Sequence, residues 1–165
     1  MNAFIRILVL LLVAPVSAQA QSAGGEIRGQ GYVFIAPIVA SSTYIPPAAG
    51  FNTGFGGDIL FMPGAGVGAE LGLARSQNVN MGVGSINFSY RFLRKRSRVE
   101  LFVSGGPSIY FGQRSMQTGF NLGGGVNLWA ARHVAFRIEF RDNWGIHEFE
   151  GPTRFAGFRM GLAFR

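Results

Sequence analysis

The segment Gly84-Ser-Ile-Asn-Phe-Ser-Tyr-Arg-Phe92 decides the fold of this chain, because apolar and polar residues alternate along it without a break. One face is apolar or lacks a side chain and consists of Gly84, Ile86, Phe88, Tyr90 and Phe92. The other face is polar and consists of Ser85, Asn87, Ser89 and Arg91. A period of two is the pattern of a β-strand whose two faces meet different surroundings.

The same alternation recurs along the rest of the chain. It is strong over residues 134–141 and 157–164, and weaker copies occupy 56–61, 65–74, 99–106 and 120–128. An eighth segment, residues 27–38, is apolar on both faces after Gly31, so the alternation does not fix its phase. The sequence therefore predicts an all-β chain of eight strands.

The breaks between these segments alternate in length. Short breaks fall at residues 62–64, 93–98 and 130–133. Longer ones fall at residues 41–55, 75–81, 110–118 and 142–152. Eight strands with short turns at one end and longer loops at the other predict an antiparallel up-and-down β-barrel.

Such a barrel is either a soluble lipocalin-type cup or a transmembrane barrel, and the polar face distinguishes the two. That face is rich in Gly, Ser, Ala and Asn, which suit a crowded interior, whereas a solvated exterior favours Lys, Glu and Thr. The single lysine, Lys95, falls in a predicted turn. Aromatic residues lie toward the ends of the apolar face, as interfacial girdles require: Phe61, Tyr90, Phe92, Phe120, Phe140, Phe158 and Phe164. The pattern favours an eight-stranded transmembrane β-barrel.

The polar face also predicts a charge network in the lumen. Its acidic and basic residues balance, and they are Asp58, Glu70, Glu100 and Glu139 with Arg91, Arg137, Arg141 and Arg159. A symmetric turn at 93–98 would place Arg91 opposite Glu100, and Glu139 has an arginine two residues away on either side. Buried charges must be paired. The alternative is a set of exposed surface ion pairs; the uncharged opposite face favours the lumen.

The first segment is typical of a secretory signal peptide over residues 1–20. Arg6 supplies the positive charge, residues 7–14 form the apolar region, and 18–20 (Ala-Gln-Ala) match a cleavage site. The alternative is a transmembrane anchor, which needs about 20 apolar residues. The mature barrel domain is then expected over residues 21–165.

At this point the chain resembles small bacterial outer-membrane β-barrel proteins of the OmpA/OmpX-like superfamily. The resemblance covers the mature chain and depends on the strand order and on two segments, residues 119–129 and 136–142. It implies export through the secretory pathway and residence in the outer membrane of a Gram-negative-type bacterium. It also implies contact with outer-membrane lipid and lipopolysaccharide, with the protein as a monomer.

The resemblance further implies an assembly signal near the end of the sequence. Arg159, Gly161 and Phe164 match its pattern, whereas Arg165 stands where the pattern has a terminal aromatic residue. The resemblance implies recognition by the barrel-assembly machinery, although Arg165 departs from the family pattern at its last position.

Few residues of the chain suggest a catalytic or metal-binding site. Cysteine is absent, which excludes thiol catalysis and cysteine zinc sites. The formal charge of +7 comes without the aromatic-basic motifs of nucleic-acid binders, so no nucleic-acid partner is expected. His133 falls in a short turn without a His-x-Ser pattern. His147 falls in a long loop with Asp142, Glu148 and Glu150, which could bind a cation or abstract a proton but fit a solvated loop better.

We therefore expect no catalytic residue, cofactor or metal, and a non-enzymatic outer-membrane barrel with a structural or adhesive role carried by its outer loops. The alternatives are a lipid A-modifying enzyme and a narrow pore. Eight strands leave little room for an open channel.

Overall fold

The computed structural model describes residues 28–42, 45–76, 80–92, 97–112, 116–146 and 153–165. The expected signal peptide and the start of the mature chain lie outside these residues. The eight strands are β1 (Arg28–Ser42), β2 (Ile45–Leu60), β3 (Ala65–Ser76), β4 (Asn80–Phe92), β5 (Val99–Gly112), β6 (Met116–Trp129), β7 (Val134–Ile146) and β8 (Thr153–Phe164). Among the described residues, no helix is long and apolar enough to cross a membrane.

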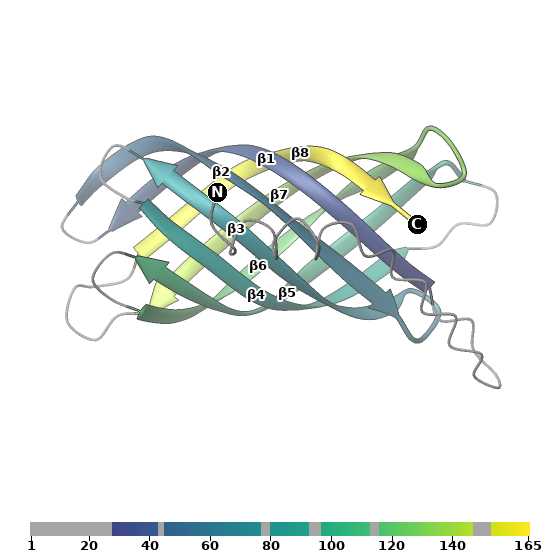
Figure 1. Ribbon diagram of the computed structural model, residues 1–165, viewed down its shortest axis with the longest axis horizontal. Coiled ribbons are helices and arrows are strands. Elements are labelled where there is room, and N and C mark those ends of the chain that lie inside the picture. Colours follow the sequence, from purple (N-terminus) through teal and green to yellow (C-terminus); the bar gives the residue numbers. More distant parts are fainter. Residues whose placement is uncertain (1–27, 43–44, 77–79, 93–96, 113–115, 147–152) are drawn as a thin grey trace, which may run out of the picture.

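Each strand pairs antiparallel with its neighbours in sequence, and β8 pairs with β1, so the sheet closes into a barrel of strongly tilted strands (Figure 1). One circuit along paired residues passes through Tyr32, Gly56, Glu70, Ser85, Ser108, Gly119, Gly145, Thr153 and Ser42. The circuit returns to β1 ten residues farther along the strand, between Tyr32 and Ser42, and this stagger accompanies the tilt. The predicted eight-stranded antiparallel barrel is confirmed.

The predicted difference in loop length is wrong. The expected loop over 41–55 is mostly strand, since β2 begins at Ile45 and Ala48 pairs with Ala40. The connections at the end where long loops were expected span only residues 43–44, 77–79, 113–115 and 147–152. Ladder hydrogen bonds need no apolar side chain, so the strands continue after the alternation of their side chains has stopped.

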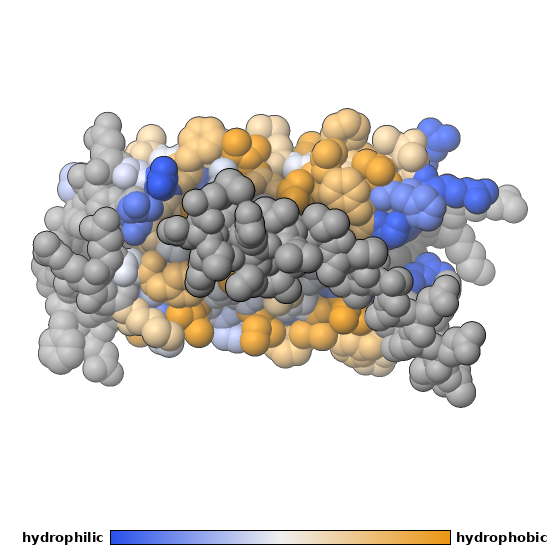
Figure 2. All heavy atoms as spheres, in the orientation of Figure 1, coloured by the Kyte–Doolittle hydropathy of each residue, from blue (hydrophilic) through white to orange (hydrophobic). Residues whose placement is uncertain are grey.

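The two faces follow the predicted alternation. Phe88 is 64% exposed and its neighbour Asn87 is 1% exposed, so the apolar face points outward. On β1 the structure supplies the phase that the sequence left open: Tyr32 and Phe34 are buried in the lumen, and Val33 and Ile35 are exposed. Apolar residues accordingly cover much of the outer surface (Figure 2).

The aromatic residues do not all lie at the ends of the strands. Phe140 and Phe158 pair directly across β7 and β8, with ring centroids 5.2 Å apart, near the middle of both strands. Their predicted place in an interfacial girdle is therefore wrong. The error arises because the strands extend well beyond the alternating segments from which the ends were inferred.

The turn between β2 and β3 is built by Pro63 and Gly64. Ala65 N donates to Met62 O at 3.2 Å, and Gly64 has a φ of 86°. Proline in the second position and glycine with positive φ in the third are typical of a type II turn. This short turn was predicted, and it marks the end of the barrel that we call the turn end, where connections 61–64, 93–98 and 130–133 lie.

Candidate functional site

The lumen holds all eight charged side chains of the predicted network. Each residue is between 1% and 7% exposed: Asp58, Glu70, Arg91, Glu100, Arg137, Glu139, Arg141 and Arg159. Four carboxylates and four guanidinium groups cancel in formal charge. Removing so many charges from water is costly unless each one is paired, and the contacts below supply that pairing.

The central cluster joins strands that lie far apart in sequence. Arg159 Nη1 donates to Glu70 Oε1 at 2.8 Å, and Tyr32 Oη donates to Glu70 Oε2 at 3.0 Å. Glu139 accepts from Arg137 Nε at 3.1 Å and from Arg141 Nε at 2.5 Å. Because Arg141 Nη2 also lies 4.0 Å from Glu70 Oε2, the two carboxylates belong to one network across the lumen.

A second cluster lies closer to the turn end. Arg91 Nη2 lies 2.8 Å from Asp58 Oδ2, and Arg91 Nη1 lies 3.4 Å from Glu100 Oε1. Asn127 Nδ2 donates to the same Glu100 oxygen at 2.8 Å. The expected pairing of Arg91 directly opposite Glu100 is wrong, because Arg91 pairs with Phe102 and reaches Glu100 diagonally. Asp58 is the closer partner of Arg91, and it could not be predicted from the symmetry of the 93–98 turn, which concerns β4 and β5 alone.

Inward-facing glycines make room for these large side chains. A β-carbon on Gly56 would lie 2.6 Å from the Tyr32 ring, and one on Gly54 would lie 2.7 Å from the Phe34 ring. The aromatic rings of β1 thus lie over the glycine backbone of β2. An eight-stranded lumen has space only for packed side chains, so large residues on one strand require small ones on the next.

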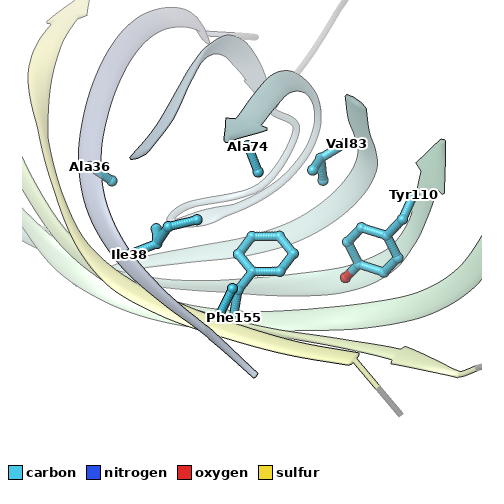
Figure 3. Packing of buried hydrophobic residues seen from close by; sticks show 7 residues of the cluster. Ala36, Ile38, Ala74, Val83, Tyr110 and Phe155 are labelled. Atoms are coloured by element: carbon cyan, nitrogen blue, oxygen red, sulfur yellow. The ribbon is translucent and has the colours of Figure 1, made fainter. Parts of the chain in front are cut away.

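An apolar layer closes the lumen on the other side of the central cluster, toward connections 43–44, 77–79 and 113–115. The layer consists of Ala36, Ile38, Ala40, Ala74, Val83, Tyr110 and Phe155, and most of these side chains point into the lumen together in Figure 3. The Tyr110 and Phe155 rings meet edge to face with centroids 5.7 Å apart. This layer was not predicted from the sequence, although β1, which is apolar on both faces, is the signal that indicates it.

The residues considered for chemistry do not form a site among the described residues. His133 is exposed, and its Nδ1 lies 2.8 Å from the backbone oxygen of Arg165. Asp142 lies beside Arg154, whose Nε is 3.0 Å from Asp142 Oδ1. His147, Glu148 and Glu150 lie outside the described residues. No group of three metal-ligating side chains occurs in the part of the chain that the structure describes.

The expected assembly-signal residues lie on β8 and face different sides. The Arg159 side chain binds Glu70 in the lumen, and Phe164 is 43% exposed on the outer surface. Gly161 pairs with the lumen residue Arg137, and a β-carbon there would collide with the backbone of β1. Each residue therefore has a contact within the barrel, and its part in assembly stays a prediction.

Comparison with known proteins identifies the fold. No protein-family model matches the chain, and no curated protein matches it. Among solved structures, Neisserial surface protein A is similar over 82% of this chain and 96% of its own, with 19% identity and a TM-score of 0.61. The N-terminal β-barrel domain of Pseudomonas aeruginosa OprF is similar over 83% and 100%, with 16% identity and a TM-score of 0.55.

The outer membrane protein OprG from Pseudomonas aeruginosa is also similar, over 85% of this chain and 97% of its own, with 8% identity and a TM-score of 0.56. At these identities the likeness concerns the fold. The chain has the closed eight-stranded antiparallel fold of these small outer-membrane β-barrels.

Proposed function

We propose that the chain is an integral outer-membrane β-barrel with a filled lumen and no enzymatic activity, which serves a structural or surface-contact role. The observation that carries this proposal is the reversed distribution of polarity. Large apolar side chains are exposed on all eight strands, while charged residues such as Arg141 and Glu139 are 1% exposed inside. A soluble barrel would reverse this arrangement, because water must meet polar groups and lipid must meet apolar ones.

The filled lumen argues against the pore alternative. Two charge clusters and an apolar layer that includes Ile38, Tyr110 and Phe155 lie in succession along the lumen. Eight strands enclose space for side chains and leave none for a wide aqueous path. The expected result is the absence of stable single-channel currents in planar bilayers, and steady ohmic currents would favour the pore.

The enzyme alternative lacks a catalytic arrangement among the described residues. A lipid A-modifying barrel needs a base that activates a hydroxyl or a water molecule. His133 lies at the turn end and contacts Arg165. Lipid A mass spectra from cells with and without the protein are expected to be identical; a lost or gained acyl chain would favour the enzyme.

A surface-contact role would depend on the strand ends, since the outer connections are short. The β1–β2 pairing shifts its register between Ala40 and Ser42 and then continues to the pair of Ser42 and Ile45, and Pro46 and Pro47 are exposed near the tip of this hairpin. We propose that these strand ends, together with residues 147–152, meet the cell exterior. Loss of cell attachment when Pro46 and Pro47 are replaced by serine would support the adhesive form of the proposal over the purely structural one.

Localisation tests the proposal directly. The chain expressed in a Gram-negative host is expected in the outer-membrane fraction, with a mature N-terminus near Gln21 by mass spectrometry. The folded barrel should migrate faster than the boiled protein in a denaturing gel. Recovery as a folded monomer without detergent would refute the proposal.

A further inference from the structure

Three arginines gather around one tryptophan at the turn end, and we call Arg98, Arg132 and Arg165 the basic cluster. Trp129 N donates to Arg98 O at 2.8 Å, and the guanidinium of Arg165 lies 3.7 Å from the centroid of the Trp129 ring. Arg165 Nε donates to Arg132 O at 3.0 Å. These contacts of Arg98 and Arg132 use their backbone oxygens, and both residues are exposed.

No side-chain carboxylate among the described residues pairs with the cluster. The eight charges of the lumen balance one another, and Glu100, two residues from Arg98, is 7% exposed and bound to Arg91 and Asn127. Outside the lumen, the one side-chain carboxylate among the described residues is Asp142, which binds Arg154 near the opposite end of the barrel. Like charges held together repel one another, so the cluster favours an anionic partner.

The apolar surface ends beside this cluster. Val99, Phe136 and Phe164 are 46%, 58% and 43% exposed, and each lies within a few residues of one of the three arginines. Figure 2 shows hydrophilic residues beyond the apolar band at the end where Figure 1 places the C-terminus. A boundary between an apolar belt and cationic side chains is the depth of lipid headgroups in a bilayer.

We infer that the basic cluster binds the phosphate headgroup of an anionic phospholipid whose acyl chains lie against the neighbouring apolar surface. The guanidinium fork matches phosphate oxygens, and the exposed Phe136 and Phe164 supply the apolar contact that a free phosphate would not use. This inference rests on the proposed membrane location. The turn end of an even-stranded barrel faces the periplasm, so the lipid would belong to the inner leaflet.

Native mass spectrometry of the full chain, refolded in micelles with equal amounts of phosphatidylglycerol and phosphatidylcholine, tests the inference. The unchanged protein is expected to retain phosphatidylglycerol in roughly fivefold excess or more, the effect of about 1 kcal/mol from an arginine near a lipid surface. The substitutions Arg98→Gln and Arg132→Gln should each lower that ratio, and the double variant should bring it near unity. The matched control is Arg75→Gln, which removes an exposed arginine near the opposite end of the barrel.

Equal retention of the two lipids by the unchanged protein would overturn the inference. So would a preference that survives the double variant, or one that Arg75→Gln reduces as much as Arg132→Gln does. Co-sedimentation with peptidoglycan that depends on Arg98 and Arg132, without lipid preference, would identify a polysaccharide partner instead. A chain that forms no heat-modifiable barrel in micelles would refute the proposed function itself, which separates that failure from a folded barrel without lipid preference.

Discussion

Arg141 and Gly123 lie directly opposite each other on β7 and β6, and the arginine side chain occupies the space that a β-carbon on Gly123 would need. Such a β-carbon would lie 2.7 Å from the backbone oxygen of Phe140 and 2.8 Å from Arg141 Nε, the atom that donates to Glu139. The glycine thus permits the central charge cluster without a polar contact of its own. Gly123 matters because it has no side chain and therefore leaves room for the large side chain of Arg141 on the paired strand.

This relationship predicts that Gly123→Ala displaces Arg141 and destabilises the barrel. Overpacking of a filled interior costs about 1–3 kcal/mol, and a displaced guanidinium would also weaken its contact with Glu139. The measurement is urea unfolding in lipid vesicles. The control is Gly84→Ala, because a β-carbon at Gly84 meets only ordinary contacts at 3.6 Å or more. Equal stability of the two variants would contradict the packing argument.

The second charge cluster of the lumen predicts that Arg91 is coupled unequally to its two carboxylate partners, Asp58 and Glu100. Removing Arg91 should cost about 3–5 kcal/mol, because two buried carboxylates lose their cation. Double-mutant cycles that combine Arg91→Met with Asp58→Asn or Glu100→Gln measure each coupling separately. The coupling with Asp58, at 2.8 Å, should exceed that with Glu100, at 3.4 Å. Additive effects in both cycles would mean that these residues do not interact.

The fold could be predicted from the sequence because the lumen and the exterior select different residues at every second position. Alternation does not distinguish the two faces where both accept the same residues, as on β1, where Phe34 faces the lumen and Val33 faces outward. It also fails where the outward face no longer requires apolar residues. There the pairing of Ala40 with Ala48 continues the ladder after the pattern has ended.

The lumen residues could be identified by the face that they share, but their partners could not. Glu70 and Arg159 are separated by 89 positions, and their contact depends on the tilt and stagger of the closed barrel. Neither quantity follows from the alternation within single strands. The apolar layer around Phe155 could not be predicted for a related reason. Its members come from several strands, and each one alone looks like an exception to a polar face.

That layer predicts different outcomes for two phenylalanines of β8. Phe155 is 2% exposed in the lumen, whereas Phe158 is 63% exposed on the outer surface. Phe155→Ala should cost about 3–5 kcal/mol, because the filled lumen collapses only partly into the cavity. Phe158→Ala should cost less, since lipid chains refill the space. Urea unfolding of both variants in the same vesicles makes the comparison, and equal losses would refute the assignment of faces on β8.

Topology can be tested by single cysteines, because the chain has none of its own. An insertion near Ala48 would interrupt a paired strand, so exposed positions at opposite ends are better probes. We expect Asn80→Cys to react with a membrane-impermeant maleimide on intact cells. Arg132→Cys should react only after the outer membrane is opened, because an even-stranded barrel places its turn end in the periplasm. The reverse pattern would invert the proposed orientation.

The outward face itself is tested at Phe88, which is exposed, whereas its neighbour Asn87 faces the lumen. Arginine at a lipid-facing position near the bilayer midplane costs about 2–4 kcal/mol, so Phe88→Arg should destabilise the barrel by that order and impair its assembly. The control Phe88→Leu should be mild, because lipid tails accept either side chain without the close packing of a core. The measurement is unfolding in vesicles together with the recovery of folded barrel from membranes. If this exposed face met water instead of lipid, Phe88→Arg would be tolerated and the folded protein would not need detergent. A spin label at Phe88 provides an independent readout: it should be relaxed by oxygen dissolved in the bilayer, and relaxation by a water-soluble reagent alone would show that this face meets water.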